Sequence, residues 1–298
     1  MRITFKTPAE VNRPQENLLK DFFLLGGGLI AVVVLVFFIL GFIANELVLH
    51  MSPTMEKRIV KILPKYSFLV KKETKNSEIK KYVQSVFVKI LKDSGPHAYD
   101  YEVVVVEDDI VNAFALPGGK IVLFTGFLDQ VESENELAMV LGHELGHFKN
   151  RDHLRGYGRA LVFWALLSAL SLGQGSDVVS SFVNILETIS SLKFNRTQEI
   201  QADEYGLERL YGGYNTTVGA ADFFERLSQE EIKKGSQFYE FLSTHPLSKN
   251  RVNHIHELSK GRGWDKQTKK ISIPKRIKKE LAAITLKTES KKKKPNKK

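Results

Sequence analysis

The chain has 298 residues, of which 43% are hydrophobic and 26% are charged, a composition that supports one large globular domain or two modest ones. It contains no cysteine, which excludes disulfide bonds and thiolate metal ligands, so any bound zinc would need histidine and carboxylate ligands. The net charge of +10 comes from one end of the chain, because residues 265–298 carry 14 Lys or Arg against 3 Asp or Glu.

Residues 22–44 form an apolar stretch without a single charged side chain. A helix of this length extends for about 35 Å, which exceeds the thickness of a bilayer's hydrocarbon core, at about 30 Å. A secretory signal peptide is the alternative, but its apolar region is shorter, at about 7–15 residues, and no small-residue cleavage site follows here. We therefore expect a transmembrane anchor, preceded by an N-terminal flank at residues 1–21.

The orientation of this anchor is not set by the positive-inside rule, which compares Lys and Arg on the two sides of a span. Positive side chains flank the apolar stretch on both sides. They are Arg2, Lys6, Arg13 and Lys20 before it and Lys57, Arg58, Lys61 and Lys65 after it.

The segment after the anchor is predicted to contain one helix and a small sheet. Residues 77–93 are predicted to be helical because apolar side chains recur every three or four positions. Three runs of β-forming residues follow at 101–106, 110–115 and 120–125, separated by turn-forming residues.

The next predicted helix carries the most informative motif of the chain. Ser133 and Glu136 form the S-x-x-E pattern of a helix start, and residues 143–147 then read HELGH, an HExxH motif. Histidines four positions apart lie on one helix face, where both can bind a single ion, and the glutamate can take a proton from water at that ion. A bare HExxH also arises by chance, so the rest of the site must come from elsewhere in the sequence.

Two apolar stretches follow this helix, at residues 161–172 and 178–192. The first is too short to span a bilayer, and the second contains Asn184, Glu187 and several serines. We expect two core helices that pack over the HExxH helix, with a second membrane hairpin as the alternative.

A third metal ligand is needed, because catalytic zinc sites take three protein ligands and keep the fourth position for water. Glu199 and Asp203 are four positions apart on a predicted helix, so one can bind the metal while the other orients a ligand. Taken alone, such a pair usually belongs to a solvated helix face. Its combination with HExxH is what favours a metal site.

Four separated blocks of the sequence resemble the membrane-associated gluzincin peptidases typified by HtpX and the Ste-type CAAX prenyl proteases. The blocks are NAFALPGG at 112–119, HELGHFKNRDH at 143–153, QEIQAD at 198–203 and STHPLSKNR at 243–251. The resemblance implies an α+β fold, with a mainly helical zincin-type domain at residues 51–262 and a small antiparallel sheet. With one clear span, the chain is most similar to single-anchor quality-control members of the family.

The same resemblance implies a metal site. It assigns one zinc ion per chain to His143, His147 and Glu199, and it makes Glu144 the general base. Asp203 would orient a zinc-binding histidine.

The resemblance also implies a substrate cleft. Asn112, Ala113 and Phe114 would contact the substrate backbone, His245 would stabilise the oxyanion, and Arg251 would help to hold that part of the cleft. From the residues alone, His245 is as easily a turn histidine and Arg251 a surface charge. We interpret His153 as a helix-end residue or as one that supports a metal ligand from outside. His254 and His256 are two positions apart and point to different helix faces, so we expect neither to belong to the site.

The expected function is a membrane-anchored zinc endopeptidase that hydrolyses misfolded or unfolded polypeptides, located in a bacterial inner membrane with its catalytic domain in the periplasm. The alternative is a membrane-tethered chaperone or assembly factor whose zinc site is occluded. Residues 265–298 are expected to be a disordered basic tail, or else a contact with anionic lipid. Nucleic acid is not an expected partner, because the basic residues have no aromatic interleaving.

Overall fold

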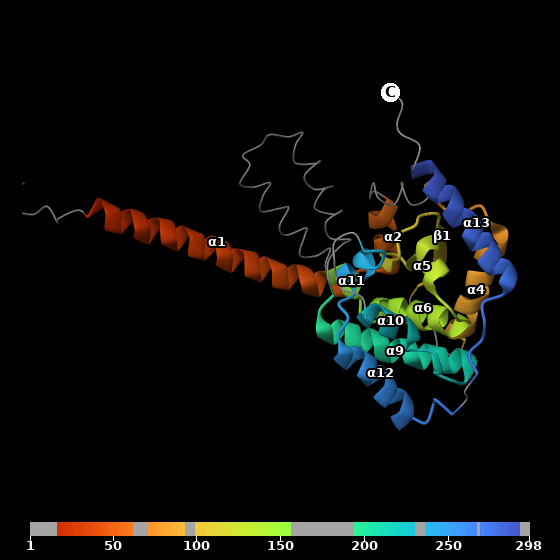
Figure 1. Cartoon of the computed structure of the whole chain (residues 1–298). Coiled ribbons are helices and arrows are strands. Elements are labelled where there is room, and N and C mark those ends of the chain that lie inside the picture. The colour runs from red at the N-terminus through yellow and green to blue at the C-terminus, as the bar shows by residue number, and fades with distance from the viewer. Residues whose placement is uncertain are drawn as a thin grey trace, which may run out of the picture.

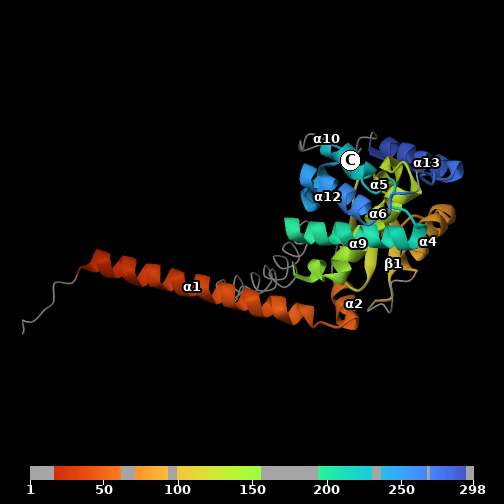
Figure 2. The ribbon, with the colours of Figure 1, turned by 90° about the horizontal axis from the view of Figure 1, so that it is seen from below.

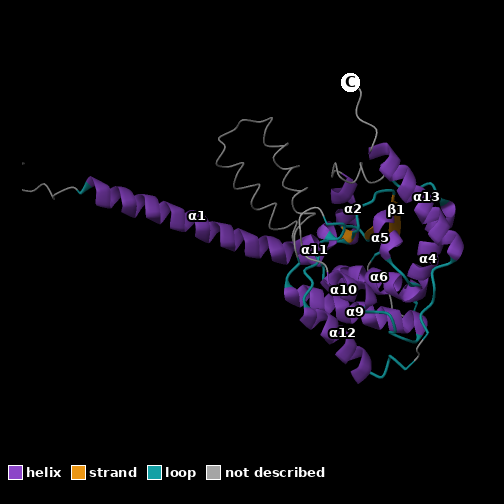
Figure 3. Cartoon of the chain, viewed as in Figure 1, coloured by secondary structure: helices purple, strands orange, loops and turns teal. Residues whose placement is uncertain are grey.

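The computed structural model describes six stretches of the chain: residues 17–61, 71–92, 99–155, 194–229, 236–266 and 269–292. One long helix leads into a folded body of helices around a three-stranded sheet (Figure 1). The fold is therefore α+β and mainly helical, as predicted (Figure 3). The two apolar stretches at 161–172 and 178–192 lie outside the described residues.

Helix α1 (Leu18–Leu49) contains the predicted anchor and extends beyond it at both ends. Its segment Leu18–Ala44 is long and apolar enough to cross a membrane, and no part of that segment's most apolar window is buried in the molecule. The helix projects away from the folded body, with the short helix α2 (Pro53–Lys61) at its base (Figure 2). A core helix would be buried, so this exposure favours an anchor.

Helix α4 (Ser77–Leu91) confirms the prediction made from its apolar spacing. The side chain of Asn76 caps its start by accepting hydrogen bonds from the backbone N–H groups of Glu78 and Ile79. The apolar face is buried in the core and consists of Ile79, Val83, Val86, Phe87 and Ile90.

The sheet contains β1 (Glu102–Val106), β2 (Ala113–Leu116) and β3 (Lys120–Phe124), in the order β1-β3-β2. The prediction of an antiparallel sheet is wrong, because β1 pairs with β3 in parallel while β2 pairs with β3 antiparallel. The loop from 107 to 112 places β2 at the far edge of the sheet and leaves a gap beside β1. The tight turn after β2 then brings β3 into that gap, between the two other strands. The turn uses Gly118 and Gly119 at φ of 84° and 88°, a backbone region that favours glycine.

Two long helices pack against each other below the sheet. They are α6 (Glu134–Lys149), which the Ser133 side chain caps as predicted, and α9 (Arg196–Tyr214). Small residues permit a close approach, because a Cβ atom added to Gly146 would lie 2.7 Å from the Cα atom of Ala202. The remaining helices are α5 (Thr125–Gln130), α10 (Asp222–Gln229), α11 (Tyr239–Thr244), α12 (Lys249–Gly261) and α13 (Lys275–Lys292).

The C-terminal region differs from the expected disordered tail over residues 269–292. Helix α13 packs against α4 and α5 and buries Ile277, Leu281 and Ile284. Before it, Ile271 exchanges hydrogen bonds with the start of α6, donating to the side chain of Asn135 and accepting from the backbone of Glu134. The many lysines obscured an i, i+4, i+7 apolar spacing, so the folded body extends beyond the predicted boundary at residue 262.

Candidate metal centre

Helix α6 supplies three buried functional side chains from its interior turns. His143, Glu144 and His147 are each 0% exposed. The Nε2 atoms of the two histidines lie 3.2 Å apart, as expected for residues that share one helix face.

Glu199 approaches these histidines from the first turn of α9. Asn195 and Gln198 form a reciprocal capping box that fixes where this helix begins. The Glu199 carboxylate lies 3.7 Å from Nε2 of His143 and 3.5 Å from Nε2 of His147. The structure thus brings together the three residues that were assigned to the metal.

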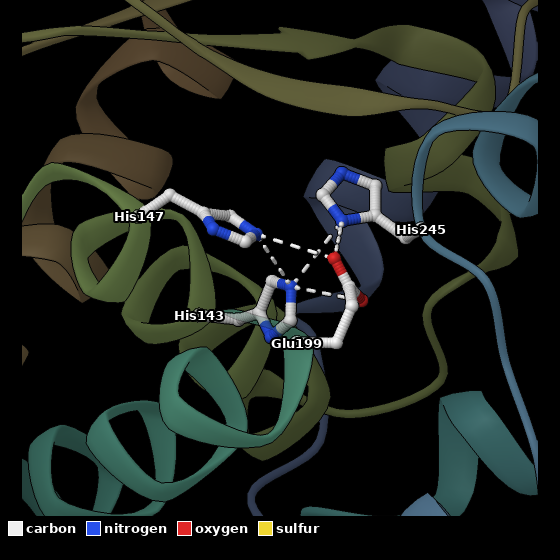
Figure 4. Close-up of side chains that lie close together, drawn as sticks. All are labelled: His143, His147, Glu199 and His245. Carbon is white, nitrogen blue, oxygen red and sulfur yellow. Dashed lines mark hydrogen bonds and ion pairs between the residues drawn. The ribbon is translucent and has the colours of Figure 1, made fainter. Parts of the chain in front are cut away.

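His245 joins the same cluster from the end of α11. Its Nδ1 atom lies 3.3 Å from Nε2 of His143 and 3.2 Å from Oε1 of Glu199. Figure 4 shows the three imidazoles and the carboxylate converging on one point. Four side chains therefore face this point, whereas the sequence led us to expect three.

The spacing of the donor atoms of His143, His147 and Glu199 fits a small tetrahedral cation. A tetrahedral site with metal–ligand bonds of about 2.0–2.1 Å has edges of about 3.3–3.4 Å, because an edge is about 1.6 bond lengths. The donor atoms of His143, His147 and Glu199 are 3.2–3.7 Å apart, so they can occupy three corners of such a site and leave the fourth to water. With His245 included, the four donor atoms lie within 4.8 Å of one another. Imidazole nitrogen and carboxylate oxygen are ligands that zinc accepts.

Each helix histidine is oriented by a carboxylate on its other ring nitrogen. Nδ1 of His143 lies 2.9 Å from Oδ1 of Asp203, and Nδ1 of His147 lies 3.0 Å from Oδ2 of Asp152. Such pairs direct Nε2 toward a metal. Asp203 was predicted for this position. Asp152 was missed, and the only signal for it was its place in the block that follows HELGH.

Arg251 is buried against two carboxylates of the metal cluster, and the structure does not place it on an open cleft. The side chain is 1% exposed, and it donates to Asp203 through Nε at 2.8 Å and through one terminal nitrogen at 2.7 Å. Its other terminal nitrogen contacts Glu199 and the carbonyl of Pro246. The guanidinium donates to both carboxylates and to a backbone carbonyl, so it holds Asp203 and Glu199 in place at the site.

The charges of this cluster keep both acids ionised. Burial alone would raise the pKa of Asp203, but the Arg251 charge and the hydrogen bond from His143 hold that pKa below its usual value. Burial likewise opposes ionisation of Glu199, yet the neighbouring histidines, His245 first, hold its pKa well below the usual range. Ionised carboxylates are the form that binds or orients a cation.

Glu144 differs from every other acid in the cluster. Neither of its carboxylate oxygens has a hydrogen-bond partner among the described residues, although both are buried. Nε2 of His245 is also without a partner there and lies 3.5 Å from Oε1 of Glu144. Buried polar atoms are normally satisfied, so these three atoms indicate a position for water or substrate.

The strand β2 borders the cluster from the sheet side, since it packs against α6. Ala113 and Phe114 belong to β2, and Asn112 precedes it and accepts a hydrogen bond from the Ala113 N–H through its side chain. All three residues are buried, at 9% exposure or less. Their contact with substrate remains a prediction. His254 and His256 make partly exposed pairs with Glu204 and Glu225, away from the cluster.

Comparison with known proteins identifies the family to which this geometry belongs. Residues 75–259 match the family described as Peptidase family M48. The chain belongs to this family. The resemblance drawn from the four sequence blocks is thereby confirmed at the family level, whereas a particular relation to HtpX or to the Ste-type proteases is not shown.

The similar M48 proteins come from organelles and bacteria. Mitochondrial metalloendopeptidase OMA1 of Arabidopsis thaliana is 40% identical over 169 residues, which are 54% of this chain and 33% of that protein. Metalloprotease LoiP of Escherichia coli is 31% identical over 61% of this chain and 71% of its own length. OMA1 of Schizosaccharomyces pombe is 34% identical. The alignments thus span about one third to one half of these two OMA1 proteins.

Proposed function

We propose that this M48 chain is a membrane-anchored, zinc-dependent endopeptidase. The observation that carries the proposal is the pair of buried oxygens on Glu144, which have no hydrogen-bond partner among the described residues and lie beside the donor atoms of His143, His147 and Glu199. A purely structural metal site has no use for such a carboxylate. A hydrolytic site needs a base at this place, because water must lose a proton as it attacks a peptide carbonyl.

The residues divide the chemistry between them. Zinc held by His143, His147 and Glu199 would supply the Lewis acidity that polarises a carbonyl and acidifies water. Glu144 accepts the proton of the attacking water and later delivers it to the leaving amine. His245 presents Nε2 on the same side, where it donates a hydrogen bond to the oxygen that becomes negative.

The substrate class is unfolded or misfolded polypeptide. The support for this is β2, which pairs only with β3 among the described strands and lies beside the active helix. An extended substrate paired with such a strand is held by backbone hydrogen bonds, which give little sequence selectivity. Asn112, Ala113 and Phe114 would form this surface, and Arg251 would hold the metal-binding carboxylate.

We place the protein in a bacterial inner membrane by a single span, α1, with the peptidase domain in the periplasm. The exposed apolar surface of α1 supports the single span, and the similarity to two E. coli metalloproteases, LoiP and YcaL, supports a bacterial source. A reporter fused to the C-terminus checks it. A reporter that folds only in the periplasm should be active. Activity of a cytoplasmic reporter alone would contradict the proposed orientation.

Glu144→Gln tests the function. The variant keeps the size of the side chain but removes the base, so cleavage of an unfolded substrate should fall about 10²–10⁴-fold while zinc content is unchanged. Cleavage and metal content are measured on the same purified full-length preparation. Wild-type cleavage by this variant would remove the hydrolytic role.

A second function is favoured by one observation. Side chains of the cluster, including Glu144 and His245, are 0% exposed, so they are covered from solvent in this conformation. A membrane-tethered chaperone or assembly factor with an occluded metal site would have this property. In that case Glu144→Gln would leave cellular function intact, whereas the endopeptidase requires an opening motion and fails without its base.

A further inference from the structure

Glu56 is a fully buried carboxylate in the segment that joins the apolar helix to the peptidase domain. It lies in α2 and is 0% exposed. It also lies before residue 75, where the match to the peptidase family begins. A buried carboxylate requires several donors, and the origin of those donors shows what the segment holds together.

The donors to Glu56 come from three separate parts of the fold. The hydroxyl of Tyr99 donates at 2.7 Å and the backbone N–H of Gly118 at 2.9 Å. Arg151 contacts it at 3.2 Å and His153 at 3.4 Å. The hydrogen bonds from His153, Gly118 and Tyr99 hold the pKa of Glu56 below its usual value, although burial opposes the shift.

Arg151 has a backbone conformation that the side-chain contacts must stabilise. It follows α6 directly and has φ of 56°, a left-handed position at a helix end where glycine is preferred. One terminal nitrogen donates to the carbonyl of Leu49, the last residue of α1, at 2.6 Å. The other contacts Glu56 and the hydroxyl of Tyr99. The loop after the HExxH helix is thus tied to the end of the apolar helix.

The next residue connects this loop to the metal cluster. One carboxylate oxygen of Asp152 lies 3.0 Å from Nδ1 of His147, and the other accepts from Gln198 at 2.7 Å. Gly118 carries the second connection, since it lies in the turn directly after β2. That turn fits closely against α2, because a Cβ atom on Gly118 would lie 3.0 Å from the Cα atom of Lys57.

We propose that Glu56 is a positioning residue that fixes the second metal-binding histidine through Arg151 and Asp152, and the substrate-side strand through Gly118. The geometry of the site then depends on the segment at the base of the anchor. The inference rests on the proposed metal site but not on any particular substrate.

The test uses the full-length protein with Co²⁺ in place of zinc, because the visible absorption of Co²⁺ reports ligand geometry. Glu56→Gln should change that spectrum and weaken Co²⁺ binding about 10-fold, as is typical when an outer hydrogen bond to a ligand is disturbed. The matched control is Glu136→Gln, another buried carboxylate, which accepts from Arg226 at 2.6 Å near the other end of α6. It should lower thermal stability but leave the spectrum and the Co²⁺ affinity unchanged.

Two milder variants cover the case in which Glu56→Gln does not fold. Tyr99→Phe removes one donor to Glu56, and Arg151→Lys keeps the charge but cannot reach both Leu49 and Glu56. Both should change the Co²⁺ spectrum from that of the wild type. Wild-type spectra in these variants, or an equal shift in Glu136→Gln, would overturn the inference. A wild-type protein that binds no Co²⁺ would instead contradict the proposed metal site itself.

Discussion

Each helix histidine of the cluster is held by two interactions, one toward the shared point and one toward a carboxylate outside it. Asp203 is the carboxylate that contacts Nδ1 of His143, and it is in turn held by Arg251. This chain of contacts gives Arg251 a supporting role at the metal site. It neutralises Asp203 and Glu199, and it lies too deep to contact a substrate.

Arg251→Met distinguishes these two roles. The variant leaves two buried carboxylates without their counter-charge, so the free energy of unfolding should fall by about 3–5 kcal/mol. Urea denaturation of the wild type and the variant measures this change. Arg262→Met is the control, because Arg262 forms a partly exposed pair with Glu208 and lies over the Trp264 ring, so its loss should cost at most about 2 kcal/mol. An Arg251→Met protein with wild-type stability and a raised KM would instead support substrate contact.

The sequence predicted the residues of the site unevenly, for identifiable reasons. His143, Glu144 and His147 follow from spacing on one helix, which is local information. Glu199 and Asp203 share a helix face, but only the family resemblance linked that face to the histidines. Asp152 and Glu56 could not be predicted, because their partners are set by contacts between distant segments.

At the scale of elements, the closeness of α6 and α9 is what assembles the cluster. Gly142 and Gly206 also meet at this crossing, where an added Cβ atom on either would lie about 3.0 Å from the other helix. Because these glycines have no side chains, the two helices approach closely, and the first turn of α9 brings Glu199 to the histidines. These glycines carry no catalytic group, and nothing in their local sequence marks them as contacts.

The elements themselves were predicted better than their arrangement. Caps and apolar spacing located α4 and α6, because both signals are local. The predicted direction of pairing was wrong for β1 and β3. The order β1-β3-β2 is set by the last strand taking the central position, which is not a local property of any strand. Helix α13 was missed, because a high lysine content resembles a solvated tail even where three apolar residues share a face.

At the scale of the whole molecule, the anchor and the active helix meet. The Arg151–Leu49 contact places the C-terminal end of α6 at the base of α1 (Figures 1 and 2). In the proposed topology, the second metal-binding histidine lies close to this junction and therefore near the membrane surface. Polypeptide segments at that surface would be the first to reach the site.

The central claim is that one zinc ion is held by His143, His147 and Glu199. Metal analysis of the purified full-length protein tests it most directly. We expect about one zinc per chain in the wild type, and loss of that zinc when both histidines are replaced by alanine. Full peptidase activity without stoichiometric metal, or an unchanged zinc content in the double variant, would contradict the claim.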